Sequence, residues 1–222
     1  MKYFSVSISD DLKVIGHYPQ AKLRTDEGDN VRVDGYLAMR PDKFPDFVPN
    51  YKLELHPRAK PTNFLPKSPA SFGWIVDSKL KSILENHKLP KHHFYPIKVY
   101  HKNTVLDYYW LHYIVDDFYE FIDTNNSYGE VFEFKTPIEI VVKETFPIFS
   151  WDQIIKEEKK HEFNSTRIGK IVMKKDFPKY DLYETRSINY FTIISEPLKQ
   201  VFEKESITGM EIKPFDKFIV DE

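Results

Sequence analysis

Apolar residues fall in short segments along the chain, and their spacing predicts strands more often than helices. At the start, Phe4, Val6 and Ile8 alternate with serines, which is the period of a half-buried strand. Four later segments are rich in β-branched and aromatic residues and predict further strands: 104–115, 138–143, 167–175 and 180–194. The polar segment 25–30, "TDEGDN", indicates a hairpin-like turn.

One pattern occurs twice. Residues 75–97, "IVDSKLKSILENHKLPKHHFYPI", and residues 193–215, "IISEPLKQVFEKESITGMEIKPF", align without a gap, 118 positions apart. In the first copy, an apolar run precedes Asp77 and Ser78, either of which can cap a helix, and an apolar stripe follows: Leu80, Ile83 and Leu84. Pro96 then marks an edge strand or its start.

The second copy repeats this order of signals. Ser195 is the expected helix cap, Glu196 and Pro197 suit a first helical turn, and an apolar stripe follows: Leu198, Val201 and Phe202. Gly209 takes the turn before "MEIKPF". Each copy therefore predicts strand, capped helix, strand.

Between 41 and 70 the chain carries too many prolines for regular helix or central strand: 41, 45, 49, 57, 61, 66 and 69. Interspersed apolar and aromatic side chains indicate an ordered extended strap that packs on the surface of the body. Ser150 and Gln153 form a capping box for a short helix that reaches about residue 160.

These elements predict an α+β fold: a mixed β-sheet with short helices and two similar strand-helix-strand units, about 72–99 and 190–217. The two units can pack their helix stripes against one shared sheet, which makes 1–222 a single domain. A proline-rich strap that separates an N-terminal lobe from both units is the alternative.

Composition narrows the chemistry. The chain has no cysteine, so disulfides, thiolate metal sites and cysteine nucleophiles are excluded. With 7 glycines and no GxGxxG or GxxxxGK[ST], a nucleotide cofactor is not expected. No apolar run approaches the roughly 20 residues of a membrane-spanning helix, and no targeting segment is evident. We expect a soluble protein with no cofactor and no membrane partner.

Charge is segregated although the net charge is -2. Residues 52–102 hold ten Lys or Arg against three acids, while residues 103–134 hold seven acids and no Lys or Arg. The acidic block would attract a basic partner if its carboxylates share one face. Alternatively, the two blocks adjoin in the fold and neutralise each other.

The acidic block is also aromatic, which favours a protein-binding surface because Tyr and Trp dominate binding hot spots. Alternation along 104–115 sends one set of side chains into the core, but the sequence does not say which. The candidate partner-binding residues are Tyr108, Trp110, Asp116, Asp117, Tyr119, Glu120 and Asp123.

The sequence contains no motif that indicates a catalytic or metal-binding site. Five histidines lie between 87 and 112, but adjacent His92 and His93 diverge in a strand, and no HExxH is present. No catalytic or metal-ligating residue is assigned. The lysines of the first repeat fit a solvated helix face better than a nucleic-acid site, since the pI is about 6.5. The alternative function is an enzyme or small-ligand protein with a pocket between the repeats, using His92, His93 or His112.

Two longer stretches, "FGWIVDSKLKSILENHKLPKHHFYPIKV" and "YFTIISEPLKQVFEKESITGMEIKPF", carry a resemblance to a known family. They resemble the immunity proteins of bacterial polymorphic toxin systems, most strongly at 72–99 and 190–215, and "KLELHPRAKPTNFLP" adds to the likeness. The first copy lacks the turn glycine. The resemblance implies a cytoplasmic α+β protein that binds and neutralises a cognate toxin without catalysis. We expect that toxin to present a basic surface; the oligomeric state stays open.

Overall fold

The computed structural model describes residues 1–222 except 25–34, 67–71, 137–138, 162–164, 189 and 221–222. Strands and short helices mix along the described chain, which confirms the α+β class. The predicted turn at 25–30 lies outside the described residues. The helices are α1 (Leu12–Ile15), α2 (Ser78–Leu84), α3 (Phe118–Phe121), α4 (Trp151–Lys160) and α5 (Glu196–Lys204), with a 3₁₀ turn η2 (Tyr36–Ala38).

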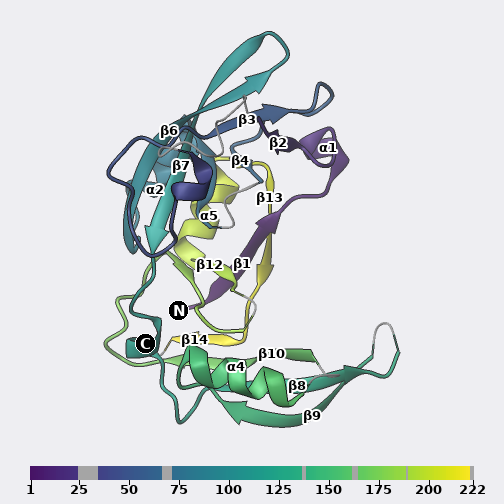
Figure 1. The fold of residues 1–222 in the computed structure, drawn as a ribbon, viewed down its shortest axis with the longest axis vertical. Coiled ribbons are helices and arrows are strands. Elements are labelled where there is room, and N and C mark those ends of the chain that lie inside the picture. The colour runs from purple at the N-terminus through teal and green to yellow at the C-terminus, as the bar shows by residue number, and fades with distance from the viewer. Residues whose placement is uncertain (25–34, 67–71, 137–138, 162–164, 189, 221–222) are drawn as a thin grey trace. The chain divides into compact units, whose positions relative to one another are not determined.

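The strands form three sheets over the described residues, with orders β2-β3-β6-β7-β5-β4, β14-β10-β8-β9 and β11-β12-β1-β13 (Figure 1). Their bounds are β1 (Tyr3–Ile8), β2 (Ala21–Leu23), β3 (Lys52–Leu55), β4 (Phe64–Leu65), β5 (Trp74–Asp77), β6 (Lys91–His101), β7 (Thr104–Ile114), β8 (Tyr128–Phe134), β9 (Ile140–Pro147), β10 (Ser165–Met173), β11 (Leu182–Glu184), β12 (Thr192–Ser195), β13 (Met210–Pro214) and β14 (Phe218–Val220).

The chain divides into two compact units. Unit 1 contains residues 1–6, 115–197 and 213–222, and unit 2 contains residues 7–114 and 198–212. The single domain expected for 1–222 stays a prediction, and each unit is described by itself.

Unit 2 is built on the six-stranded sheet, in which β6 and β7 form a long antiparallel hairpin from Lys91 opposite Ile114 to His101 opposite Thr104 (Figure 1). Pro96 lies inside β6, which pairs with strands on both sides. The parallel partner β3 pairs only with residues 98–100, so the missing N–H of Pro96 costs no bond on that side. The edge-strand prediction therefore holds only locally.

The strap prediction for 41–70 needs correction. This range contains β3 and β4, because residues 52–55 and 64–65 are the proline-free stretches between its prolines. The part of the strap before β3 does cover the sheet: Tyr51, together with Met39 just before the strap, is buried in one cluster with Tyr95 and Trp110. We call residues 39–51 the covering segment. The Tyr95 hydroxyl donates to the Pro45 carbonyl oxygen at 3.1 Å.

Unit 1 contains the sheet β14-β10-β8-β9, with α4 lying along it (Figure 1). The helix begins where the sequence predicts, since the Ser150 hydroxyl accepts a hydrogen bond from the Gln153 amide at 3.3 Å. Ile154 is the fully buried residue of this amphipathic helix. Trp151 and Ile155 are its other apolar residues, and the rest of α4 is charged or polar, as expected for a helix that covers a sheet with one stripe.

The two predicted repeat units have the expected element order but do not share a sheet. β5, α2 and β6 belong to the six-stranded sheet, whereas β12 and β13 belong to β11-β12-β1-β13. The shared-sheet expectation is therefore wrong. In both sheets the strand before the helix and the strand after it flank a third strand, which is β7 in one sheet and β1 in the other. A single unit used twice stays a prediction.

The similarity between the two segments extends beyond the 23 aligned residues. Phe64 pairs with Val76 in β4 and β5, and Leu182 pairs with Ile194 in β11 and β12, each 118 positions later. The same offset relates further hydrogen bonds. These bonds run from the Asp77 and Ser195 amides to the carbonyls of Asn63 and Asp181, and from the Ala59 and Phe177 amides to those of His56 and Lys174.

Candidate functional site

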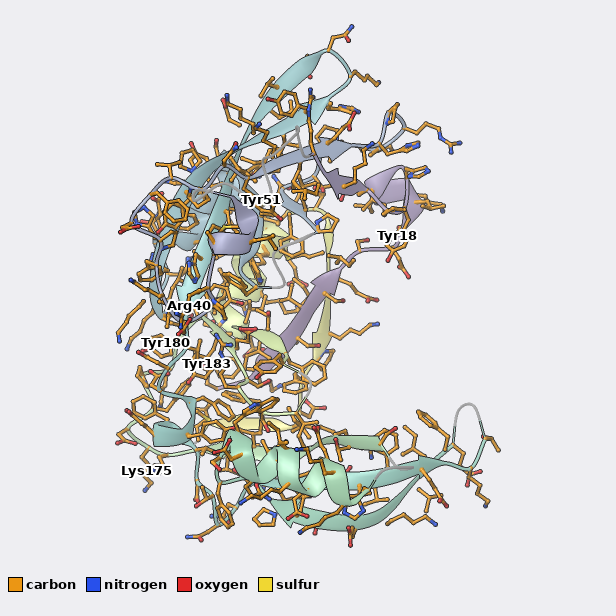
Figure 2. All side chains as sticks on the ribbon, viewed as in Figure 1. Tyr18, Arg40, Tyr51, Lys175, Tyr180 and Tyr183 are labelled. Carbon is orange, nitrogen blue, oxygen red and sulfur yellow. The ribbon has the colours of Figure 1, made fainter. Side chains whose placement is uncertain are left out.

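Tyr108 and Trp110, the first two candidate partner-binding residues, lie in the core of unit 2. Trp110 is fully buried, and its indole N–H donates to the Phe72 carbonyl oxygen at 3.3 Å. Tyr108 is also buried, and its hydroxyl donates to the Thr62 carbonyl oxygen at 2.6 Å. A partner cannot contact either side chain without opening the core, so these two assignments are corrected. Figure 2 marks the position of Tyr51, the strap residue that packs beside Trp110.

Alternation could not reveal this burial because β7 is covered on both faces. Leu111 and Tyr113, which point opposite to Trp110, are buried as well. The strap lies on the Trp110 face, and α2 packs on the other face, where the Lys81 ammonium lies 5.2 Å from the centre of the Tyr109 ring. Because both faces of β7 are buried, neither alternating set of its side chains is available to a partner.

Asp117 supports the interior of unit 1 rather than an open surface. Its carboxylate accepts hydrogen bonds from the Tyr183 hydroxyl at 2.8 Å and from the Tyr180 hydroxyl at 3.2 Å. The two tyrosine rings stack with centroids 5.3 Å apart, and Figure 2 shows their positions. Burial, with the Asp117 charge beside it, raises the pKa of Tyr180 to about 12 and raises the pKa of Tyr183 strongly.

Tyr119 and Asp123 are also committed to contacts within unit 1. The Tyr119 hydroxyl donates to the Arg186 carbonyl oxygen at 2.6 Å. The Asp123 carboxylate accepts from the Asn126 side-chain amide at 2.7 Å and from the Asn125 backbone amide at 3.0 Å. These bonds hold the pKa of Asp123 below its usual range. Asp123 therefore stabilises its own turn.

Asp116 and Glu120 are the two candidates that remain exposed. Lys174 lies close to Glu120, since its ammonium donates to the Glu120 carbonyl oxygen at 2.6 Å. This cation offsets part of the negative charge at that position. The exposed acidic surface is therefore smaller than the sequence indicated.

The remaining acids of the block lie beside cations. Glu130 accepts from the Arg167 guanidinium at 2.7 Å, and Glu133 forms an ion pair with Lys143. Asp107 is the cross-strand partner of Lys98, which comes from the basic block. Local neutralisation thus describes these three acids better than a shared negative face does.

An exposed apolar surface on β8 and β9 was not predicted. Phe134, which is 59% exposed, is the cross-strand partner of Ile140, which is 38% exposed, and the next residue on the same face, Val142, is 41% exposed. We call these three residues the β8–β9 surface. Over the described residues β9 pairs only with β8, so its other edge is open. The sequence predicts a strand at Ile140–Val142. It does not predict that this strand lies at the edge of its sheet, because the order of the strands depends on the pairing of β8 with β10.

A small cavity of about 140 Å³ in unit 2 brings two histidines together. The rings of His17 and His56 stack with centroids 3.3 Å apart, beside the ion pair of Lys22 and Glu54 at 3.2 Å. Desolvation, and then the charge of His17, lowers the pKa of His56. Sequence reasoning missed this pair because the two histidines lie 39 positions apart, outside the histidine-rich segment.

The histidines chosen for the alternative function do not form a site. His112 is fully buried, and its ring stacks on Trp110 with centroids 4.8 Å apart. His92 and His93 begin β6 as neighbours, so their side chains diverge as predicted. Among the residues that the structure describes, no three His, Cys, Asp or Glu side chains gather as metal ligands.

No protein-family model matches the chain, and no curated protein matches it by sequence. None of the helices in the described part of the chain is long and apolar enough to cross a membrane.

Proposed function

We propose that this chain is a non-enzymatic immunity protein that binds and neutralises a cognate bacterial toxin domain in the cytoplasm. The resemblance at 72–99 and 190–215 motivates the class. The observation that carries a binding function is the β8–β9 surface: three exposed apolar side chains beside an open strand edge. Exposed apolar patches and unpaired strand edges are both common sites of protein association.

The β8–β9 surface replaces most of the acidic aromatic surface as the candidate contact region. Phe134 and Ile140 supply apolar area, and the open edge of β9 offers backbone groups that an added strand can pair with. Asp116 and Glu120 stay as exposed acids that favour a basic partner and speed its association.

The test is capture from the native organism with tagged protein at low and then moderate salt. We expect one stoichiometric partner that carries a toxin domain and whose toxicity the protein suppresses. Replacing Phe134 and Ile140 with serine should reduce the captured partner about tenfold or more. The matched control is Val105→Ser, which changes an exposed apolar residue on β7. Absence of any toxin-bearing partner would overturn the proposed function.

The acidic contribution is tested separately. Asp116→Lys with Glu120→Lys should lower the association rate and weaken its dependence on salt. Asp10→Lys changes an exposed acid outside the candidate residues and serves as control. Equal association rates for both variants and the wild type would remove Asp116 and Glu120 from the binding surface.

A further inference from the structure

One face of the six-stranded sheet in unit 2 is covered by the strap. Tyr95, Ile97 and Val99 of β6 and Trp110 of β7 are buried on this face. The cover is an extended segment of residues 39–51, which contributes buried side chains to the same cluster and accepts the Tyr95 hydroxyl. This sheet face is therefore completed by an extended, proline-rich and aromatic segment.

The equivalent positions in unit 1 carry different side chains. Those 118 residues after Tyr95, Ile97 and Val99 are Lys213, Phe215 and Lys217. Trp110 pairs with Ile75, and the residue that pairs with the equivalent Ile193 is Ser5. Large apolar groups are thus replaced by a serine and two lysines.

The covering segment is also replaced. The residues 118 positions after the covering segment are 157–169, and most of those that the structure describes belong to α4 and β10. A cavity of about 380 Å³ lies at Phe215 and Lys217, and Arg167, Ile168, Phe191 and Pro214 line the rest of it with Asp216. Its volume is in the range of small binding sites. The counterpart of the strap-covered face is therefore hollowed in unit 1.

We propose that this cavity binds an extended segment of the toxin partner, with an aromatic side chain packed against the Phe191–Phe215 pair, whose ring centroids lie 4.9 Å apart, and a carboxylate at Lys217 and Arg167. The proposal rests on the proposed function, because it assigns the partner's segment to the cavity. The strap supplies the precedent for the shape of the occupant. The two cations supply the reason for its charge.

The electrostatics of the cavity favour an anion. Lys217 is half-buried, and its ammonium donates to the Ile168 carbonyl oxygen. Burial lowers the pKa of Lys217, and the positive charge of Arg167 lowers it further. The negative charge of Glu130 raises this pKa by a smaller amount. A carboxylate placed there would relieve this repulsion between the cations. Arg167 keeps its bond to Glu130 and lies over the Phe132 ring, 5.1 Å from its centroid.

The Phe132 contact joins the cavity to the proposed binding surface. Phe132 is two residues before Phe134 on the same face of β8 and is the cross-strand partner of Val142. Because Arg167 covers Phe132 and lines the cavity, one partner segment can leave the cavity and continue on the β8–β9 surface.

The first experiment selects short random peptides, displayed on phage, on the whole purified protein, with counter-selection on Lys217→Glu. We expect enriched peptides that contain an aromatic residue close to Asp or Glu. A synthetic peptide of the enriched sequence is then titrated against the wild type and variants. Selection that yields no peptide dependent on Lys217, or only peptides without an acid, would overturn the proposal.

The variants separate charge from fold. Lys217→Glu and Phe191→Ala should each weaken the peptide about tenfold or more, whereas Lys217→Arg should retain most of the affinity. Lys175→Glu reverses an exposed lysine of unit 1 outside the cavity and should leave the affinity unchanged. Equal weakening by Lys175→Glu would show that only overall charge matters and would overturn the assigned site.

The second experiment repeats the capture from the native organism with Lys217→Glu. A toxin partner held by the wild type but lost from this variant supports the cavity. A partner held equally by both proteins overturns the cavity and leaves the proposed function standing. If the wild type holds no partner, the proposed function fails, and the peptide selection alone decides whether the cavity binds an acidic aromatic segment.

Discussion

Tyr108 and Tyr3 donate equivalent hydrogen bonds in two different sheets. Tyr108 on β7 donates to the Thr62 carbonyl oxygen at 2.6 Å, and Tyr3 on β1 donates to the Tyr180 carbonyl oxygen at 2.9 Å. The two acceptors are 118 residues apart. The central strand follows its strand-helix-strand unit in the first case, whereas the second unit uses the strand at the start of the chain.

This equivalence predicts similar losses of stability for Tyr108→Phe and Tyr3→Phe. Each change leaves a carbonyl oxygen without its donor in the interior, which costs about 1–3 kcal/mol. Urea unfolding followed by fluorescence and circular dichroism measures the loss. Tyr18→Phe is the control, because Tyr18 is 57% exposed (Figure 2). The prediction fails if either variant is as stable as that control.

Stability above about pH 10 should depend on buried tyrosines, among them Tyr3, Tyr108 and the pair at Asp117. Burial raises the pKa of Tyr180 and of Tyr183 above the ordinary tyrosine value of about 10. The folded state therefore holds these protons more tightly than the unfolded state. Their stabilising contribution is complete below pH 10 and is lost as the pH rises through the folded values. The urea midpoint should fall between about pH 10 and 12.

Tyr183→Phe should flatten this alkaline decline, because it removes the group with the larger shift. Tyrosinate absorbance of the folded protein gives an independent measurement, with Tyr18→Phe as the matched control. A wild-type midpoint that stays constant over this range would contradict the assignment. So would a decline of the same slope in Tyr183→Phe.

The histidine stack in unit 2 predicts a loss of stability on the acidic side. Desolvation and the charge of His17 lower the pKa of His56, so the unfolded state binds its proton more readily. The contribution is complete above the ordinary histidine value of about 6.5 and is lost as the pH falls through the folded value. His56→Gln should reduce the slope of the urea midpoint below pH 6.5. His92→Gln, at the exposed start of β6, should not.

Local signals in the sequence located α2, α4, α5 and most strands, but not the one-turn helices α1 and α3. Asp77 caps α2 by accepting from the Leu80 amide at 2.8 Å, and Ser150 caps α4, because capping depends on residues that are neighbours in sequence. β3 was missed because proline content was averaged over a long range. The four residues of β3 contain no proline and lie between Pro49 and Pro57.

The candidate site was predicted less well because its residues are decided by distant contacts. The burial of Trp110 depends on a strap some 60 to 70 residues earlier in the chain, and the charge of Glu130 is offset by Arg167, 37 positions later. Hydrophobic alternation and charge counts within one segment predict neither the burial of Trp110 nor the pairing of Glu130 with Arg167. Asp116 and Glu120, which are exposed as expected, were the part that local reasoning could reach.

The turn after α5 provides a prediction with opposite signs at two nearby positions. Gly209 has φ of +97°, and a Cβ there would collide with the Phe64 carbonyl oxygen. Gly209→Ala should therefore cost about 2 kcal/mol or more, from backbone strain and overpacking. Ser206 has φ of +54° without being glycine. Ser206→Gly should relieve that strain and stabilise the protein by about 0.5 kcal/mol.

Urea unfolding of both variants measures this pair, and hydrogen exchange at the Phe64 amide gives a local readout. That amide donates to the Thr208 carbonyl oxygen at 3.1 Å, so a displaced turn in Gly209→Ala should expose it. Ser206→Gly should leave its protection intact or increase it. If Gly209→Ala matched the wild type in both measurements, the close approach of this turn to β4 would be wrong.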